Sequence, residues 1–198
     1  MHSALAQRRA AGRTAGRAPG HDCAMPDAPR PDRDTARGPT RPAIRDLVFS
    51  PAERALIAAA RRAVLGTIAP EGLPRLVPIC FVLAERRDGR GRPVLYTPLD
   101  DRPKRSPDPL RLARMEDITA RPEITVLVDR WSEDWRALGW VRMHCEAAVV
   151  MPVPGEREEH ALAVAALLAK YRQYAGHDLE ARPIIRIAVT RTTSWGIE

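Results

Sequence analysis

The feature of this 198-residue sequence that most restricts its fold is a succession of short apolar runs separated by turn-forming residues. Residues 63–69 and 73–84 are rich in β-branched and other apolar side chains, and Pro70-Glu71-Gly72 between them is typical of a chain reversal. A third run at 93–98 follows a polar loop that contains Asp88-Gly89. Runs connected by such short turns pair as antiparallel neighbours, so the pattern predicts hairpins.

Three further strand patterns and three helical patterns complete the predicted architecture. We expect strands at 123–129, 138–151 and 184–190, the last ending near Trp195, and helices at about 50–62, 110–120 and 156–174. The helices do not alternate regularly with the strands, as they would in a doubly wound parallel sheet. The sequence therefore predicts a mainly β (α+β) fold, a six-stranded antiparallel barrel with about three peripheral helices.

The N-terminal segment differs from the rest of the chain in composition. Residues 1–45 hold nine arginines, no lysine and four acidic residues, so they carry +5 of the formal charge of +7. A segment so rich in Arg, Ala, Gly and Pro buries too little apolar surface to offset its ordering entropy. We therefore expect a disordered extension over 1–45 and one folded domain over 46–198. The extension lacks the interleaved aromatic residues on which nucleic-acid bases stack, so its composition disfavours nucleic-acid binding as its role.

Several classes of protein are disfavoured by the sequence. No apolar run reaches the 18 residues of a membrane span, and no apolar block follows the N-terminus as in a secretory signal, so we expect a cytoplasmic protein. The three cysteines show no CxxC spacing, and the adjacent His144 and Cys145 would point to opposite faces of a strand. We therefore expect no metal site and no catalytic acid, base or nucleophile from the protein.

A cluster of cations follows the third strand. Arg102, Lys104 and Arg105 lie within four residues, and cations this close repel one another unless they share an anion. The cluster therefore indicates a binding site for a phosphate, such as that of a dinucleotide or flavin. The alternative is a solvated loop whose charge is partly neutralised by Asp100 and Asp101.

Three of the four tryptophans, Trp131, Trp135 and Trp140, fall within ten residues. An indole offers a flat stacking surface with a polar N–H at its edge, so Trp135 and Trp140 are candidates to cover an apolar ring system. Packing in a core or a dimer interface is the alternative, and it is the more frequent role of tryptophan.

The segments Arg62-Ala63-Val64-Leu65-Gly66-Thr67-Ile68 and Gly72-Leu73-Pro74-Arg75-Leu76-Val77-Pro78 resemble the opening hairpin of pyridoxamine 5′-phosphate oxidase-like (PPOX class) split-barrel proteins. A second set of motifs is similar to the branch of probable coenzyme F420-dependent enzymes: Tyr96-Thr97, Arg102-Pro103-Lys104-Arg105, Asp129, Asp134-Trp135, Trp140-Val141-Arg142 and Ser194-Trp195. The resemblance covers about residues 46–198. Two departures are Arg102, where the branch often has Lys, and Cys145, where Gly is usual.

The resemblance implies an FMN-binding type of split barrel that forms a homodimer, with the cofactor at the subunit interface. It implies an oxidoreductase that transfers a hydride between F420 and an unidentified small molecule. An FMN-dependent oxidoreductase and a non-catalytic flavin- or tetrapyrrole-binding carrier remain alternatives. The residues implied are Arg102, Lys104 and Arg105 at the phosphate, Thr67, Val77, Pro78 and Thr97 along the ring and ribityl chain, and Trp140, Arg142 and Trp195 near the cofactor or the interface.

Overall fold

A computed structural model describes residues 49–99 and 108–197 of the chain. The predicted extension over 1–45 and the cation cluster at 102–105 lie outside the described residues. The described strands are β1 (Ala63–Ile68), β2 (Pro74–Ile79), β3 (Val82–Leu83), β4 (Val94–Pro98), β5 (Glu123–Arg130), β6 (Gly139–Val150) and β7 (Ile184–Trp195). The helices are α1 (Pro51–Ala59), α2 (Ala113–Ala120) and α3 (Arg157–Lys170), with short 3-10 turns η2 (Pro109–Arg111), η3 (Trp135–Ala137) and η4 (Arg172–Gly176).

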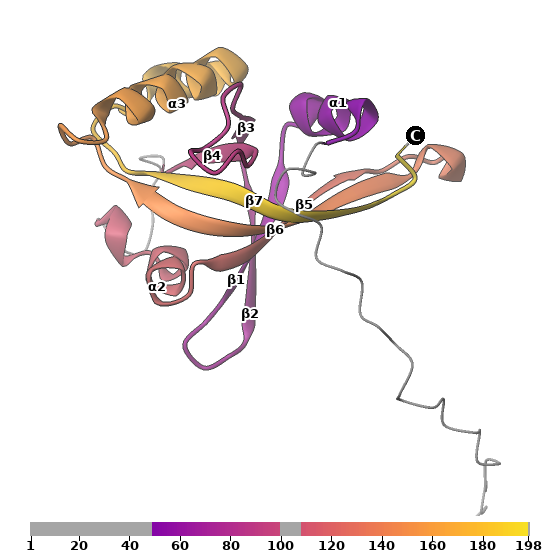
Figure 1. The fold of residues 1–198 in the computed structure, drawn as a ribbon, viewed down its shortest axis with the longest axis horizontal. Helices are drawn as coiled ribbons and strands as arrows, with labels where there is room; N and C mark the ends of the chain where they lie inside the picture. Colours follow the sequence, from indigo (N-terminus) through magenta and orange to yellow (C-terminus); the bar gives the residue numbers. More distant parts are fainter. Residues whose placement is uncertain (1–48, 100–107, 198) are drawn as a thin grey trace, which may run out of the picture. The chain divides into compact units, whose positions relative to one another are not determined.

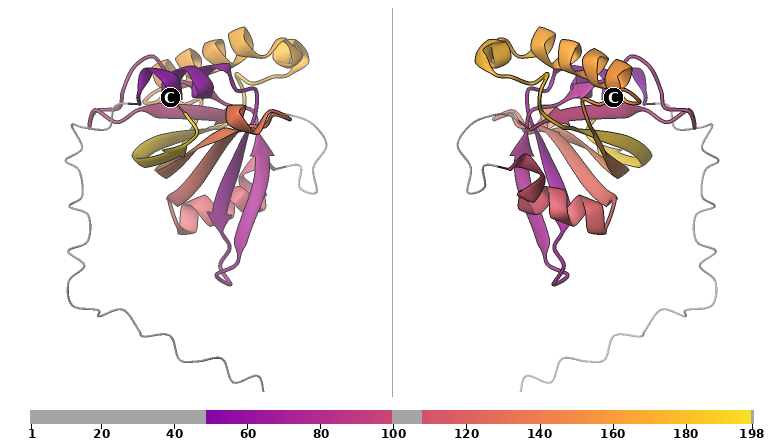
Figure 2. Two further views of the ribbon diagram at one scale, coloured as in Figure 1. Left: turned by 90° about the vertical axis from the view of Figure 1, so that its right-hand side faces the viewer. Right: turned by 90° about the vertical axis from the view of Figure 1, so that its left-hand side faces the viewer.

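All seven strands belong to one antiparallel sheet with the order β2-β1-β5-β6-β7-β4-β3 (Figure 1). The two edge strands, β2 and β3, are consecutive in the chain and only Cys80 and Phe81 separate them. The sheet must therefore curl until its two edges approach each other. Figure 2 shows the resulting strongly twisted half-barrel, which confirms the predicted mainly β split-barrel class.

The number of strands differs from the prediction, because the apolar run at 73–84 forms two strands. β2 pairs with β1, whereas β3 pairs with β4 on the other side of the barrel. The chain turns this corner at Phe81, whose fully buried side chain joins the main core. A run of apolar residues carries no signal for such a change of pairing partner, so the sequence predicted six strands where the described residues form seven.

Local sequence signals explain how the first helix and the first turn form. Ser50 accepts a hydrogen bond from the backbone N–H of Glu53, and the Glu53 side chain accepts one from the backbone N–H of Ser50, which completes a capping box at α1. In the turn between β1 and β2, Gly72 adopts a φ of 87° that other residues rarely reach. The start of a helix near residue 50 and the chain reversal at residues 70–72 were both predicted from the sequence.

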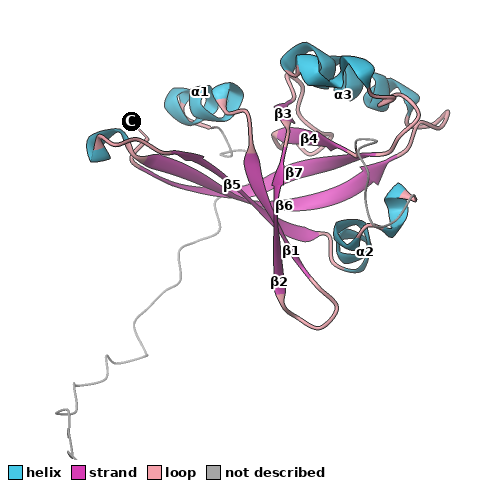
Figure 3. Cartoon of the chain, turned by 180° about the vertical axis from the view of Figure 1, so that it is seen from behind, coloured by secondary structure: helices cyan, strands magenta, loops and turns pink. Residues whose placement is uncertain are grey.

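The inner face of the curled sheet encloses the main core. Leu65 on β1, Val126 on β5, Met143 on β6 and Ile187 on β7 are all fully buried there. α2 lies against β1 and β6 on one side of the sheet (Figure 3). α3 lies against β3 and β4, where it covers a second, smaller core. The helices therefore close the parts of the barrel that the strands leave open.

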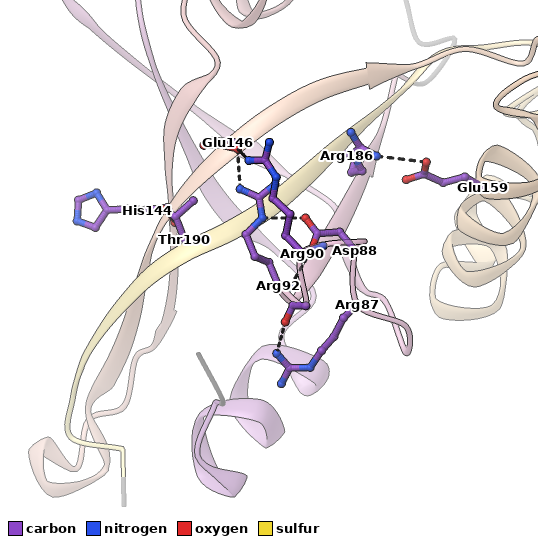
Figure 4. Close-up of polar contacts among 10 residues, drawn as sticks. Arg87, Asp88, Arg90, Arg92, His144, Glu146, Glu159, Arg186 and Thr190 are labelled. Atoms are coloured by element: carbon purple, nitrogen blue, oxygen red, sulfur yellow. Dashed lines mark hydrogen bonds and ion pairs between the residues drawn. The ribbon is translucent and has the colours of Figure 1, made fainter. Parts of the chain in front are cut away.

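A charged network fixes the loop between β3 and β4 to the sheet (Figure 4). The Asp88 carboxylate accepts hydrogen bonds from the backbone N–H groups of Arg90 and Arg92 and from Nε of Arg92. Nη1 of Arg92 donates to Oε2 of Glu146 on β6 at 2.6 Å. Arg92 is almost fully buried, so its two carboxylate partners compensate the cost of removing its charge from water.

No helix in the described ranges is long and apolar enough to cross a membrane.

Candidate cofactor site

A cavity of about 510 Å³ lies between the β1–β2 hairpin and the start of α2. Its volume is in the range typical of small-molecule sites. Strand alternation places Thr67, Arg75 and Val77 on the inner side of the hairpin, and the segment that leads into α2 supplies the opposite wall. The lining residues are Thr67, Arg75, Leu76, Val77, Leu112, Ala113 and Arg114.

A buried carboxylate on α2 organises this wall. Asp117 has 0% of its surface exposed, and its Oδ2 accepts a hydrogen bond of 2.7 Å from the hydroxyl of Thr67. Its Oδ1 accepts a 2.9 Å hydrogen bond from Nη1 of Arg75, so the two groups form an ion pair. A buried carboxylate is stable only when it is paired and hydrogen-bonded, and these two contacts satisfy that condition.

Two arginines bring positive charge to the cavity from opposite walls. Arg75 extends from β2 and Arg114 from α2. The Arg75 side chain is 40% exposed, and its Nη2 also donates to Oε1 of Glu71 at 3.3 Å. A guanidinium has five N–H donors, so three of those of Arg75 have no protein acceptor within the described ranges. The cavity thus combines apolar walls with donors suited to an anionic ligand.

The structure brings two of the predicted site residues together in this cavity, Thr67 and Val77. Pro78, the next residue of β2, is exposed on the opposite face of the hairpin. Thr97 is buried on β4, where it pairs with Ile185 of β7, and it does not line the cavity. Arg102, Lys104 and Arg105 lie outside the described residues. The described chain resumes at Asp108, six residues before Arg114 of the cavity wall.

The other predicted residues, Trp140, Arg142 and Trp195, lie together towards the far end of the sheet. Trp140 pairs with Trp195 across β6 and β7, and the guanidinium of Arg142 lies 5.6 Å from the centre of the Trp140 ring. Trp140 is opposite Asp129 of β5, whereas Gly66, beside Thr67, is opposite Thr125. Four residues of strand correspond to about 13 Å. Within one subunit, these tryptophans therefore lie too far from the cavity to contact a ligand in it.

These tryptophans belong to a face of the sheet that the described helices leave exposed. Leu76 and Pro78 of β2 lie on this face at one end, with Leu76 72% exposed. Trp195 of β7, at the other end, is 56% exposed. Large exposed apolar groups on one sheet face are typical of a surface that another protein covers.

Three residues of the cavity and its wall, Asp117, Arg75 and Arg114, were not predicted as site residues from the sequence. Asp117 follows Ala113 by four residues, so the two share a helix face, but this spacing points to the cavity only once Ala113 is known to line it. Arg75 alternates with apolar residues on β2, a pattern that equally describes a solvated strand. Only its contact with Asp117 on α2, 42 residues away, distinguishes a cavity residue from a solvated one.

The adjacent His144 and Cys145 lie on opposite faces of β6. Cys145 is buried, and burial raises the pKa of its thiol. His144 lies on the opposite face of β6, where partial burial and the charges of Arg191 and Arg142 lower its pKa. The two side chains therefore do not form a nucleophile and base pair, as the strand alternation predicted.

The sequence matches the pyridoxamine 5′-phosphate oxidase family over residues 49–196, and the chain therefore belongs to this family. A comparison with curated proteins finds no match.

Solved structures with a similar fold include three proteins of different description. A conserved hypothetical protein from Mycobacterium tuberculosis is 21% identical, with a TM-score of 0.55, over 76% of this chain and 86% of that one. A FAD-binding protein from Mesorhizobium loti is 18% identical, with a TM-score of 0.50, over 74% and 92%. A heme-binding protein from Mycobacterium smegmatis is 22% identical, with a TM-score of 0.51, over 75% and 56%. At these identities the likeness establishes the fold.

Proposed function

We propose that the protein is an F420-dependent oxidoreductase that acts on a small molecule and binds its cofactor in the cavity between the β1–β2 hairpin and α2. The observation that supports this most strongly is the convergence of Thr67 and Val77, both implied by the family resemblance, with Arg75 and Arg114 around one cavity. Membership of an oxidoreductase family agrees with it.

The residues present fit a ring-bearing cofactor with a phosphate. Arg75 has unused donors at the cavity, and Arg102, Lys104 and Arg105 would add charge from the segment that precedes α2. Val77 and Leu112 would contribute apolar wall to the ring region. A bound deazaflavin or flavin supplies hydride transfer, and the protein supplies orientation and exclusion of water. No protein acid or base is required for this role.

The active form in this proposal is a homodimer. The exposed sheet face that carries Leu76, Pro78, Trp140 and Trp195 is the proposed interface. Within one subunit, Trp140 is distant from the cavity. Trp140 can therefore cover the cofactor only if that cofactor is bound by a second subunit. The proposed interface provides that route.

The test is a side-by-side titration of the purified protein with F420 and FMN, followed by tryptophan fluorescence and by calorimetry. We expect saturable binding of F420, with quenching of tryptophan emission, and oxidation of reduced F420 when a panel of quinones is added. Tighter binding of FMN would favour the FMN-dependent alternative. Failure of both cofactors to bind would refute the proposal.

A non-catalytic carrier of a flavin or tetrapyrrole is the second candidate. The similar fold of a heme-binding protein from Mycobacterium smegmatis favours it. The same titration extended to hemin distinguishes the two, because a carrier binds its ligand without oxidising reduced F420 in the presence of any quinone.

A further inference from the structure

We infer that Asp117 is a positioning residue that holds the hydroxyl hydrogen of Thr67, so that this hydroxyl can only accept hydrogen bonds from the cavity. The cavity therefore selects a ligand that places a hydrogen-bond donor, a hydroxyl of a polyol chain, beside Thr67. The inference rests on the proposed function, because it specifies which part of the cofactor faces Thr67. It stands on the contact between Asp117 and Thr67 and on the place of Thr67 in the cavity wall.

The first step concerns the single hydrogen of the Thr67 hydroxyl. Thr67 is 2% exposed, and its hydroxyl donates to Oδ2 of Asp117 at 2.7 Å. An ionised carboxylate only accepts, so the hydrogen is committed to Asp117. The hydroxyl then has only lone pairs to offer to the cavity. A phosphate oxygen or ring carbonyl at Thr67 would face an acceptor, whereas a ligand hydroxyl would be bound.

Arg75 holds the Asp117 carboxylate in position to accept the hydrogen bond from Thr67. Nη1 of Arg75 donates to Oδ1 of Asp117 at 2.9 Å, so the carboxylate has a cation on one oxygen and a hydroxyl donor on the other. Asp117 is fully buried, whereas Glu71, the other acidic partner of Arg75, is largely exposed. The buried contact is screened less by water than the exposed one. Asp117 therefore couples the positions of Thr67 and Arg75.

These two contacts give the cavity a defined polarity. Acceptor lone pairs lie at Thr67, and cationic donors lie at Arg75 on the neighbouring strand, opposite Thr67 in the β1–β2 register. A cofactor with a ribityl chain that ends in a phosphate carries the complementary sequence of groups, first hydroxyl donors and then an anion. The arrangement favours that chain over an apolar substituent.

The variant that tests the inference is Asp117→Asn. Arginine only donates, so the remaining oxygen of the asparagine would face Arg75 and its amide nitrogen would donate to Thr67. The Thr67 hydrogen would then be released into the cavity. Because the substitution also removes a negative charge, phosphorylated ligands would report a mixture of both effects. Uncharged ligands report the hydrogen bond alone.

The probes are therefore two uncharged rings. If FMN binds the wild-type protein, they are riboflavin, which carries the ribityl chain, and lumiflavin, which carries a methyl group in its place. If F420 binds instead, they are the corresponding deazaflavins. We expect the wild-type protein to prefer the ribityl compound by about tenfold, or about 1.4 kcal/mol. Asp117→Asn should reduce this preference at least fivefold.

If Asp117 had a merely structural role, Asp117→Asn would weaken the binding of both probes equally and leave the ratio of their affinities unchanged. That result would overturn the inference. Thr67→Val should abolish the preference, Thr67→Ser should retain it, and Asp117→Asn in the Thr67→Val background should change the ratio no further. If Asp117→Asn does not fold, the two Thr67 variants decide, since equal ratios in Thr67→Ser and Thr67→Val contradict the inference.

The matched control is Asp178→Asn, which removes one acidic charge beside α3, away from the cavity. Asp178 Oδ1 accepts a hydrogen bond from the backbone N–H of Ala181, and asparagine keeps that acceptor. This variant should keep the wild-type ratio. Absence of cofactor binding by the wild-type protein would refute the proposed function itself, whereas wild-type binding with an unchanged ratio in Asp117→Asn would refute only the role of Asp117.

Discussion

At the scale of single residues, the pair of Arg92 and Glu146 makes stability sensitive to acid. The hydrogen bond from Arg92 lowers the pKa of Glu146 below its ordinary value of 4.5. A folded-state pKa below the unfolded one gives a contribution that is complete above pH 4.5 and is lost as pH falls through the folded value. Glu146→Gln should therefore lower the melting temperature at pH 7 and flatten its fall between about pH 5 and pH 3.

The measurement for Glu146 is a series of thermal melts by circular dichroism across this pH range. The control is Glu180→Gln, which alters an exposed acid near α3 and η4, away from Arg92. It should keep the wild-type profile. Equal acid sensitivity of the wild-type protein and Glu146→Gln would contradict the assignment.

Lys170 at the end of α3 predicts a pH dependence of the same sign, but at alkaline pH. Its buried Nζ has no hydrogen-bond partner among the described residues and lies 4.4 Å from the centre of the Phe81 ring. Burial, together with the charge of Arg61, lowers the pKa of Lys170 to about 8. Between pH 8 and the unfolded value of 10.5 the unfolded chain binds more protons, so the free energy of unfolding should rise with pH.

Lys170→Met should remove this rise, which for one group is at most about 1.4 kcal/mol per pH unit. Urea denaturation of both proteins at pH 7, 8, 9 and 10 measures it. A constant difference in unfolding free energy between the two proteins across the series would show that Lys170 does not titrate in this range.

The sequence allowed prediction of two residues that line the candidate cavity, but not of the contacts that surround them. Thr67 and Val77 were expected at the ring and ribityl region because of the hairpin that they share with known relatives, and both line the cavity. No role was predicted for Asp117, because its partners are 50 and 42 residues away in the chain. A contact of that kind depends on how α2 packs, which local patterns do not encode.

At the scale of elements, Tyr171 links α3 to the corner between β2 and β3. Its hydroxyl accepts a hydrogen bond from the backbone N–H of Phe81 at 3.0 Å and lies 2.7 Å from the Phe81 carbonyl oxygen. Tyr171→Phe would leave the buried N–H of Phe81 without this acceptor. We expect a loss of about 1–3 kcal/mol in the free energy of unfolding.

Urea denaturation checks this value, with Tyr96→Phe as the comparison. Tyr96 donates to Glu159, a partly exposed carboxylate that water and Arg186 also reach, so its loss should cost less. A larger effect for Tyr96→Phe than for Tyr171→Phe would contradict the link between α3 and the corner.

The extents of the elements show where sequence patterns hold and where tertiary structure decides. β5 and β6 begin and end within one residue of their predicted bounds, because alternation and turn residues act locally. α3 ends at Lys170, four residues before the predicted end, and η4 replaces its last turn. There Tyr171 leaves the helix to reach Phe81, a long-range contact that helical periodicity does not reveal.

At the scale of the whole molecule, the proposed dimer depends on the exposed sheet face. Leu76→Arg would place a charge at the proposed interface without disturbing the core, because Leu76 is 72% exposed. We expect this variant to be monomeric and to keep its melting behaviour at high dilution. Its cofactor affinity does not test the interface, because Leu76 also lines the cavity. Light scattering coupled to size-exclusion chromatography measures its mass.

Leu162→Arg on α3 is the matched control, since Leu162 is also exposed but lies on a helix away from the proposed interface. It should leave the oligomeric state unchanged. A dimeric Leu76→Arg protein, or a monomeric wild-type protein, would contradict the proposed interface.

In the proposed function, a phosphate-bearing deazaflavin or flavin occupies the cavity between the β1–β2 hairpin and α2. A crystal structure of the protein grown with F420, and of the protein grown with FMN, tests it most directly. We predict the ribityl chain beside Thr67 and the phosphate within hydrogen-bond distance of Arg75. A cofactor bound elsewhere, for example in the second cavity beside α3 and η4 lined by Val164 and Tyr174, would contradict the account.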